Sequence, residues 1–178
     1  FSAPSDEHTE EGHITEEVHT RVAMMRKRMR KEETALRDSI RPPSRYGPSQ
    51  PRLTLVCWGS TLGAASEAAD LLSEDGEPAG VLHFSDLWPF PTEATSEALA
   101  SAGLTIGVEQ NFTGQLAKLI RMMSGHELDG RVLSYDGRPF APGDIVAGVR
   151  RVLGGEREVH VEPGEQPLPA ETEVGVNG

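Results

Sequence analysis

From residue 53 onward the sequence alternates short apolar runs with helix-length segments, and this alternation constrains the fold more than any other feature. The apolar runs lie at 53–59, 80–87, 104–110 and 132–137. The segments 66–76, 91–103, 113–125 and 142–155 carry helical patterns, and each ends at or beside a glycine. Apolar strands alternating with amphipathic helices predict βαβ units and a parallel sheet covered on both faces. We therefore expect an α/β fold over residues 53–155, a three-layer α/β/α domain with a small, mostly parallel sheet.

The first 52 residues predict an acidic arm, a surface helix and a linker. Residues 1–14 are acidic and aperiodic, and residues 15–38 are typical of a helix with Thr15 as its N-cap. One narrow apolar stripe is formed by Val18, Val22, Met25 and Met29. Residues 41–52 hold four prolines and a glycine, which predicts a linker rather than a helix or a central strand. The helix should therefore lie on another surface.

Charge and composition limit the partners of the chain. The net charge is -11, which disfavours nucleic acid, and no apolar run approaches the roughly 20 residues that span a bilayer. A single cysteine favours a reducing compartment, so we expect a cytoplasmic protein. The tail at 156–178 has six glutamates, one arginine and three prolines, and it should be extended, disordered or wrapped on a partner. Residues 1–17 are acidic and polar and do not resemble a signal peptide. Because the first residue is Phe rather than Met, we expect a processed piece or a fragment of a longer protein.

Histidine and cysteine give weak signals for chemistry. His8 and His13 lie five residues apart in the acidic arm, where the ligand types suit zinc or iron but nothing rigid fixes a geometry. A solvated or partner-facing arm is the favoured interpretation. Cys57 lies inside an apolar strand, so we assign it to the core. No metal site and no nucleophile are predicted.

The first strand ends in a run of small residues, 59–63, with Ser60 and Thr61 at its centre. Such a turn could bring backbone N–H groups to an anion at a helix N-terminus. The spacing matches neither a dinucleotide fingerprint nor a Walker loop, so a tight strand-to-helix turn is favoured. A free-standing module that binds an anion or nucleotide is the alternative to be tested.

The carboxyl ends of the predicted strands carry the more informative side chains, since sites in open α/β sheets form there. Aromatic residues on these loops either dock onto another domain or fold back over the sheet, and the sequence favours neither. An independent hydrolase built on Asp86 and Glu109 is a third, weaker hypothesis. The residues expected to face an active site or a partner are His8, His13, Ser60, Thr61, Asp86, Trp88, Phe90, Gln110, Asn111, Phe112, Gln115 and Arg138.

These stretches, taken in order, resemble the alpha subunit of the 2-oxoacid:ferredoxin oxidoreductases. The match is to its transketolase-C-terminal-like domain. It is carried by EHTEEGHITEE (7–17), RMRK (28–31), LTLVCWGSTLGAASEA (53–68), LHFSDLWPFP (82–91), GVEQNFTGQLAKLIR (107–121) and YDGRPF (135–140). Within the family, the EH…GH and VEQNFTGQ stretches look most like the 2-oxoglutarate-type enzymes.

The resemblance implies a complex that converts a 2-oxoacid and coenzyme A to acyl-CoA, CO2 and reduced ferredoxin, using thiamine diphosphate, Mg²⁺ and [4Fe-4S] clusters. It implies as partners the pyrimidine-type and gamma-type domains of the alpha subunit, the beta subunit and, through the complex, ferredoxin. The motifs for the cofactors belong to those other parts, so none is expected in this chain. The segment should pack subunits together and buttress the thiamine site, with His8 and His13 near the substrate channel.

Overall fold

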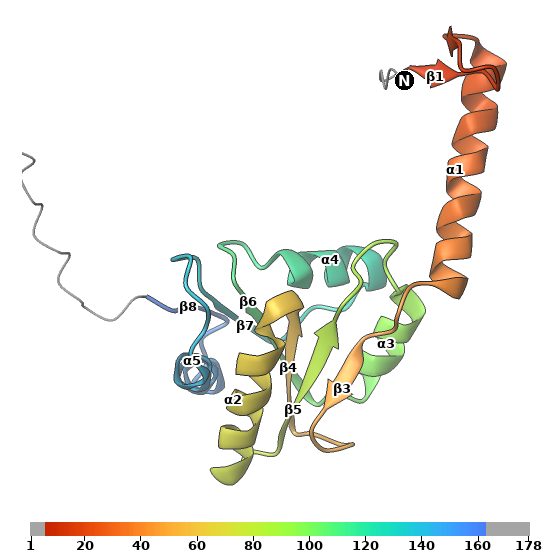
Figure 1. Cartoon of the computed structure of the whole chain (residues 1–178). Helices are drawn as coiled ribbons and strands as arrows, with labels where there is room; N and C mark the ends of the chain where they lie inside the picture. Colours follow the sequence, from red (N-terminus) through yellow and green to blue (C-terminus); the bar gives the residue numbers. More distant parts are fainter. Residues whose placement is uncertain (1–5, 163–178) are drawn as a thin grey trace, which may run out of the picture. The chain divides into compact units, whose positions relative to one another are not determined.

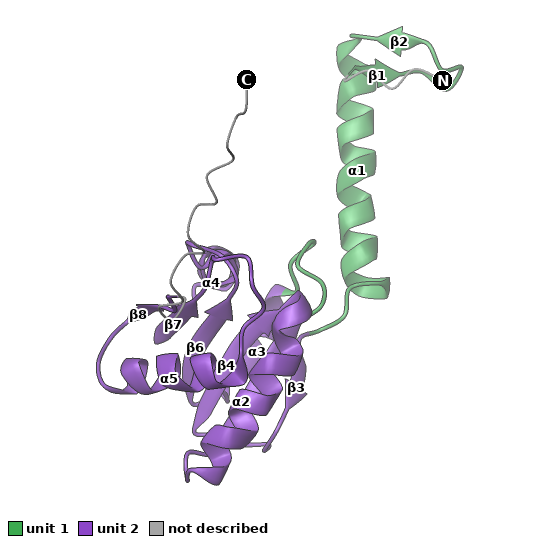
Figure 2. Ribbon diagram, turned by 60° about the vertical axis from the view of Figure 1, so that its left-hand side comes forward, with its two compact units in different colours: residues 1–42, 85–91 green, residues 43–84, 92–178 purple. Residues whose placement is uncertain are grey.

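The computed structural model describes residues 6–162, which fall into two units (Figure 2). Unit 1 is the N-terminal part up to Pro42 together with the loop Ser85–Pro91, and unit 2 is the remainder. None of the helices in the described part of the chain is both long and apolar enough to cross a membrane.

A six-stranded sheet forms the centre of unit 2. Its order is β3-β5-β4-β6-β7-β8, and every neighbouring pair is parallel except β3 with β5. The strands are β3 (Ser44–Tyr46), β4 (Leu53–Trp58), β5 (Ala79–Phe84), β6 (Leu104–Glu109), β7 (Gly130–Leu133) and β8 (Glu158–His160). The predicted small, mostly parallel sheet is confirmed.

Helices cover both faces of this sheet, which gives the predicted three layers. Figure 1 shows α2 and α5 on one face and α3 and α4 on the other. Their bounds are α2 (Leu62–Glu74), α3 (Thr92–Ala100), α4 (Gln115–Ser124) and α5 (Pro142–Leu153). Alanines on α2 let it approach the sheet closely, and Ala65, Ala68 and Ala69 are all buried there.

The near-continuous apolar strands supply the centre of the hydrophobic core. Leu55, Val56 and Cys57 in β4 are fully buried, as Ile106 is in the neighbouring strand. A strand that is apolar on both faces is stable only between two layers of helices, so the sequence pattern dictates the layering.

Both ends of the sheet extend beyond what the sequence predicts. The expected linker at 41–52 contains β3, an edge strand, and edge strands tolerate nearby prolines because one side needs no hydrogen bonds. The expected tail at 156–178 begins with β8, which pairs with β7. The sheet therefore reaches beyond residue 155, and the rest of that prediction, from residue 163, lies outside the described residues.

Unit 1 contains a hairpin and a long helix. β1 (Glu7–His8) pairs antiparallel with β2 (Ile14–Thr15), and α1 (Val18–Asp38) follows. The helix begins three residues later than predicted, because the carboxylate of Glu17 rather than Thr15 caps it and accepts the N–H of Thr20 at 2.7 Å. No residue of α1 is buried, as expected of a surface helix.

Candidate functional site

The carboxyl edge of the sheet in unit 2 is the candidate site. β4, β6 and β7 run parallel, so the segments that follow them meet at one edge. These segments are the 3₁₀ turn η1 (Gly59–Thr61), residues 110–114 and residues 134–141.

Glu109 is the best-defined polar group at this edge. The residue is fully buried at the end of β6, and its carboxylate accepts the backbone N–H groups of Leu116 at 2.8 Å and Ala117 at 3.0 Å. The side-chain amide of Asn111 donates to it at 2.9 Å. α4 has Gly114 at its N-cap, which offers no side chain, so Glu109 caps the helix from the preceding strand. Its role is structural, and the sequence does not reveal it.

The loop after β6 is built around two amides that the sequence singles out. The side-chain oxygen of Asn111 accepts the backbone N–H groups of Thr113 and Gln115, both at 3.2 Å. Gln110 reaches across to the next loop and donates to the carbonyl of Arg138 at 2.7 Å. The loops after β6 and β7 are therefore joined. The Gln115 side chain itself is exposed.

Arg138 is already engaged by its own loop. Its guanidinium donates to Asp136 at 2.6 and 2.8 Å, and its backbone N–H donates to the same carboxylate at 2.9 Å. These bonds hold the pKa of Asp136 below its ordinary value. An anion would have to compete with this carboxylate for Arg138.

Three aromatic rings meet beside these loops. Phe112 lies edge-on to Tyr135, with ring centroids 4.8 Å apart, and His160 completes the group at 5.4 and 5.6 Å. Phe112 and Tyr135 are 60% and 53% exposed. Phe140, in contrast, is buried against the core. The sequence left open whether the aromatic side chains of these loops fold back over the sheet or dock onto another domain. Phe140 folds back over the sheet, whereas the ring of Phe112 is exposed and available for docking. Sequence reasoning missed Tyr135 and His160, although Tyr135 follows a strand just as Phe112 does.

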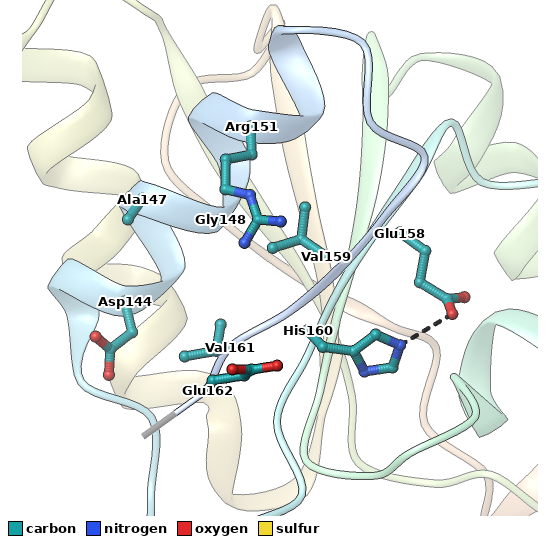
Figure 3. Close-up of a pocket in the computed structure, with 9 residues that line it drawn as sticks. All are labelled: Asp144, Ala147, Gly148, Arg151, Glu158, Val159, His160, Val161 and Glu162. Atoms are coloured by element: carbon teal, nitrogen blue, oxygen red, sulfur yellow. Dashed lines mark hydrogen bonds and ion pairs between the residues drawn. The ribbon is translucent and has the colours of Figure 1, made fainter. Parts of the chain in front are cut away.

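A groove of about 640 Å³ lies between α5 and β8 (Figure 3). Its lining includes the acidic residues Asp144, Glu158 and Glu162, although Glu158 turns its carboxylate toward His160 rather than toward α5 (Figure 3). Among the described lining residues, Arg151 alone brings a guanidinium, and it donates to Glu156 at 2.8 and 2.9 Å. The acidic lining disfavours an anion in this groove, which lies apart from the run 59–63 where the sequence suggests the anion-binding alternative.

The run 59–63 forms the tight turn that the sequence favours. Gly59 adopts φ of +58°, a left-handed conformation open to glycine, and its carbonyl lies 3.0 Å from Nε2 of His83. Ser60 is exposed, whereas Thr61 is buried.

The loop after β5 belongs to unit 1. Asp86 there accepts from the guanidinium and the backbone N–H of Arg41, at 2.8 and 3.1 Å, and these bonds lower its pKa. A lowered pKa is the wrong direction for an acid at neutral pH, so the hydrolase hypothesis gains no support. Trp88 is 63% exposed, whereas Phe90 is buried.

The acidic arm is fixed to α1 by one buried carboxylate. Glu7 is 5% exposed and pairs with Arg21 at 2.5 Å and with Arg28 at 2.6 Å. His8, on β1, is half-buried, and His13, in the turn, is exposed. Across residues 6–162, no group of three His, Cys, Asp or Glu side chains could hold a metal ion.

The Glu7 pair makes the hairpin acid-sensitive. The hydrogen bond from Arg28 holds the pKa of Glu7 below the ordinary 4.5. A depressed folded-state pKa contributes stability above the ordinary pKa, and the contribution is lost as the pH falls below it. We expect hydrogen exchange at the Thr9 amide, which bonds to His13, to accelerate as the pH falls below about 4.5 by more than intrinsic exchange explains.

Glu7→Gln should show faster exchange at neutral pH and no such transition. Glu16→Gln, which removes an exposed carboxylate of the same segment, serves as the control. If Glu7→Gln and the control behaved alike, Glu7 would not hold the hairpin.

Cys57 is confirmed as a core residue. It is fully buried, and burial raises the pKa of its thiol to about 12. At pH 8 only about one molecule in ten thousand would carry a thiolate. We expect a disulfide reagent such as Ellman's reagent to leave the native chain unlabelled and to label it once in denaturant. Rapid labelling of the native chain would contradict this burial.

Comparison with solved structures places the chain in the α/β class. A split-gene transketolase with 22% identity has a TM-score of 0.50, and the match covers 65% of this chain and 43% of that one. This likeness shows a shared α/β fold and nothing more.

More specific matches define the family. A family model described as pyruvate:ferredoxin oxidoreductase core domain II matches residues 52–145, more than half of the chain. The chain therefore belongs to this family. The 2-oxoacid:ferredoxin oxidoreductase 1 alpha subunit of Sulfurisphaera tokodaii is 33% identical over 163 residues, which is 89% of this chain and 25% of that protein. The 2-oxoglutarate synthase subunit KorA of Archaeoglobus fulgidus is 30% identical over 140 residues, with 75% and 39% covered.

A solved structure agrees with this assignment. The 2-oxoglutarate:ferredoxin oxidoreductase of Magnetococcus marinus, with 2-oxoglutarate, coenzyme A and succinyl-CoA bound, is 27% identical with a TM-score of 0.71. The match covers 85% of this chain and 26% of that one. The chain thus spans about a quarter of the length of the Sulfurisphaera tokodaii and Magnetococcus marinus chains. The family resemblance seen in the sequence is confirmed, whereas the 2-oxoglutarate type stays a prediction.

Proposed function

We propose that this chain is the C-terminal segment of the alpha subunit of a cytoplasmic 2-oxoacid:ferredoxin oxidoreductase. The complex would oxidatively decarboxylate a 2-oxoacid, transfer the acyl group to coenzyme A and pass the electrons to ferredoxin. The observation that carries the proposal is the family match over 52–145, which covers the whole central part of unit 2.

The geometry of the sheet edge agrees with a segment that forms one wall of a larger site. The carboxylate of Glu109 accepts the N–H groups at the start of α4, and the carboxylate of Asp136 accepts from the guanidinium of Arg138. What remains exposed is aromatic, with Phe112 and Tyr135 facing outward. Exposed aromatic rings beside a rigid sheet edge suit docking of another domain better than catalysis by this one.

The [4Fe-4S] clusters of such a complex do not fit the residues of this chain. A [4Fe-4S] cluster takes four cysteine ligands, and the sequence has one cysteine, which is buried in β4. We therefore assign the clusters to other parts of the complex. The family resemblance implies the same placement for thiamine diphosphate and Mg²⁺, so no step of the reaction is assigned to a side chain here.

For the substrate we propose 2-oxoglutarate. Support comes from the EH…GH and VEQNFTGQ stretches of the sequence and from the two relatives whose names include 2-oxoglutarate. His8 and His13 would lie toward the substrate or coenzyme A channel. The partners would be the pyrimidine-type and gamma-type domains of the alpha subunit, and the beta subunit.

The composition of the native assembly tests this proposal. Native mass spectrometry should find the chain in a complex with further polypeptide, and the same sample should contain iron and thiamine. A lone chain that binds coenzyme A or a nucleotide tightly would contradict the proposal and favour the binding module.

A further inference from the structure

A second, smaller cavity of about 190 Å³ lies beside α4, and we call it the basic cavity. Its cationic lining residues are Lys118, Arg121, Arg131 and Arg157, and its acidic ones are Glu127 and Asp129. It shares no lining residue with the groove between α5 and β8. In a chain with a net charge of -11, this gathering of cations is the reverse of the average charge.

Three elements place the cations around one space. Lys118 and Arg121 are three residues apart on α4, so they lie on neighbouring positions of one helix face. The backbone N–H of Arg131, on β7, donates to the carbonyl of Arg157 at 3.0 Å. This bond fixes the starts of β7 and β8 side by side, so the two arginines come from a rigid part of the sheet.

The side chain of Arg131 fills space that two glycines leave open. A Cβ at Gly114, the N-cap of α4, would lie 3.0 Å from Cδ of Arg131, and a Cβ at Gly107 would lie 3.5 Å from its Cγ. The stem of Arg131 therefore packs against β6 and the start of α4, and the residue is half-buried. A guanidinium on a packed stem loses less conformational freedom when it binds a ligand than one on a free side chain.

The guanidinium groups of the basic cavity have free donors. In unit 2 the other arginines donate to an oxygen of the protein, and they are Arg45, Arg52, Arg138, Arg150 and Arg151. The guanidinium groups of Arg121, Arg131 and Arg157 make no hydrogen bond with any other described residue. Arg121 and Arg157 lie 3.3 and 4.0 Å from Glu127, and Arg131 lies 3.1 Å from Glu158.

The nearby carboxylates do not neutralise this charge. One oxygen of Asp129 accepts both the backbone N–H and the hydroxyl of Thr105 at 2.8 Å, so this carboxylate is held at β6. Glu127 is shared between two arginines, and Lys118 has no ion-pair partner among residues 6–162. The lining thus has four cations against two carboxylates, and one positive charge is left over even when Glu158 is counted as well.

We propose that the basic cavity binds a phosphate group. Guanidinium forks match the oxygens of a tetrahedral oxyanion, and a lysine adds a point charge. The cavity of about 190 Å³ is smaller than the roughly 300 Å³ at which pockets enclose whole small-molecule ligands, so it suits one phosphate group rather than a nucleotide. The proposal does not depend on the proposed function, because the residues of the cavity alone carry it.

Titration of the full chain with inorganic phosphate tests the proposal. Calorimetry at neutral pH and low ionic strength should show one saturable site with a Kd below about 1 mM. Lys118→Gln together with Arg157→Gln should raise this Kd at least about tenfold, because both donors are lost. Arg52→Gln together with Arg150→Gln removes the same charge from exposed ion pairs elsewhere in unit 2, and it should leave the Kd within about twofold. Circular dichroism would verify that each variant is folded.

Glu127→Gln should change the affinity in the opposite direction. It removes the carboxylate that Arg121 and Arg157 share, so inorganic phosphate should bind about two- to fivefold more tightly. A folding defect would not tighten binding, so this variant keeps the proposal testable if the double variant is unstable. Weaker binding by Glu127→Gln would contradict the proposal.

A comparison of inorganic phosphate with glycerol 3-phosphate identifies the source of the group. Tighter binding of inorganic phosphate would assign the cavity to the free ion, and tighter binding of the monoester would assign it to a phosphorylated metabolite. No saturation up to about 10 mM phosphate, or equal Kd values for the double variant and its control, would overturn the proposal. It would also be overturned if the double variant failed to assemble with other subunits while phosphate bound to neither protein, since the cavity would then be a docking site for an acidic polypeptide.

Discussion

Replacing Glu109 by alanine is expected to destabilise the chain by about 3–5 kcal/mol, because the change leaves buried N–H donors without acceptors and opens a cavity. The donors are the amides of Leu116 and Ala117 at the start of α4 and the side chain of Asn111. Such a loss is a large share of the 5–15 kcal/mol that typically separates folded from unfolded domains. Far-UV circular dichroism during urea unfolding of the full chain would measure it.

Two further variants test whether the loss of stability is specific to the Glu109 carboxylate. Glu109→Gln keeps the size and one acceptor oxygen, so it should cost less than the alanine variant. Asp136→Asn removes a carboxylate from an exposed ion pair at the same edge and should change stability by under about 1 kcal/mol. If Glu109→Ala were as stable as Asp136→Asn, the carboxylate would not be the cap of α4, and a direct role in chemistry would have to be reconsidered.

The second large effect is expected at Gly103, between α3 and β6. A Cβ atom here would lie 2.5 Å from the backbone oxygen of Arg52 and 2.6 Å from that of Pro51. The residue also has φ of +64°, which strains any side chain. Gly103→Ala should therefore cost roughly 3 kcal/mol or more, since neither backbone can move without disturbing β4.

Gly125 provides the matched control. It also has positive φ, +77°, but nothing lies within 4 Å of its added Cβ. Gly125→Ala should show only the conformational cost of about 1 kcal/mol. The difference in free energy of unfolding between the two variants, measured with urea, gives the cost of the steric clash between a Cβ at position 103 and the backbone of residues 51–52. Equal losses would show that no such approach exists.

The layered fold could be predicted from the sequence because its signals are local. Each central strand is a buried apolar run, and each helix stops near a glycine. The edge strands β3 and β8 could not be predicted in the same way. Each has three residues, and each forms only because a neighbouring strand offers an open edge.

The expected site residues at the carboxyl edge of the sheet stay a prediction, whereas the capping role of Glu109 could not be predicted. Only the weak hydrolase hypothesis gave Glu109 a role in chemistry, and the fold brings the amides seven and eight residues later onto its carboxylate. The ring group of Phe112, Tyr135 and His160 joins three separate segments. Such contacts depend on tertiary placement, which no local pattern encodes.

The central claim is that this chain is one wall of a 2-oxoacid:ferredoxin oxidoreductase and has no complete site of its own. The most direct measurement is ferredoxin reduction by the purified assembly that contains the chain, assayed with 2-oxoglutarate, pyruvate or 2-oxoisovalerate. We predict reduction that requires both a 2-oxoacid and coenzyme A, fastest with 2-oxoglutarate, and none by the isolated chain. An assembly that reduces no ferredoxin with any of these acids, or an isolated chain that does so unaided, would contradict the account.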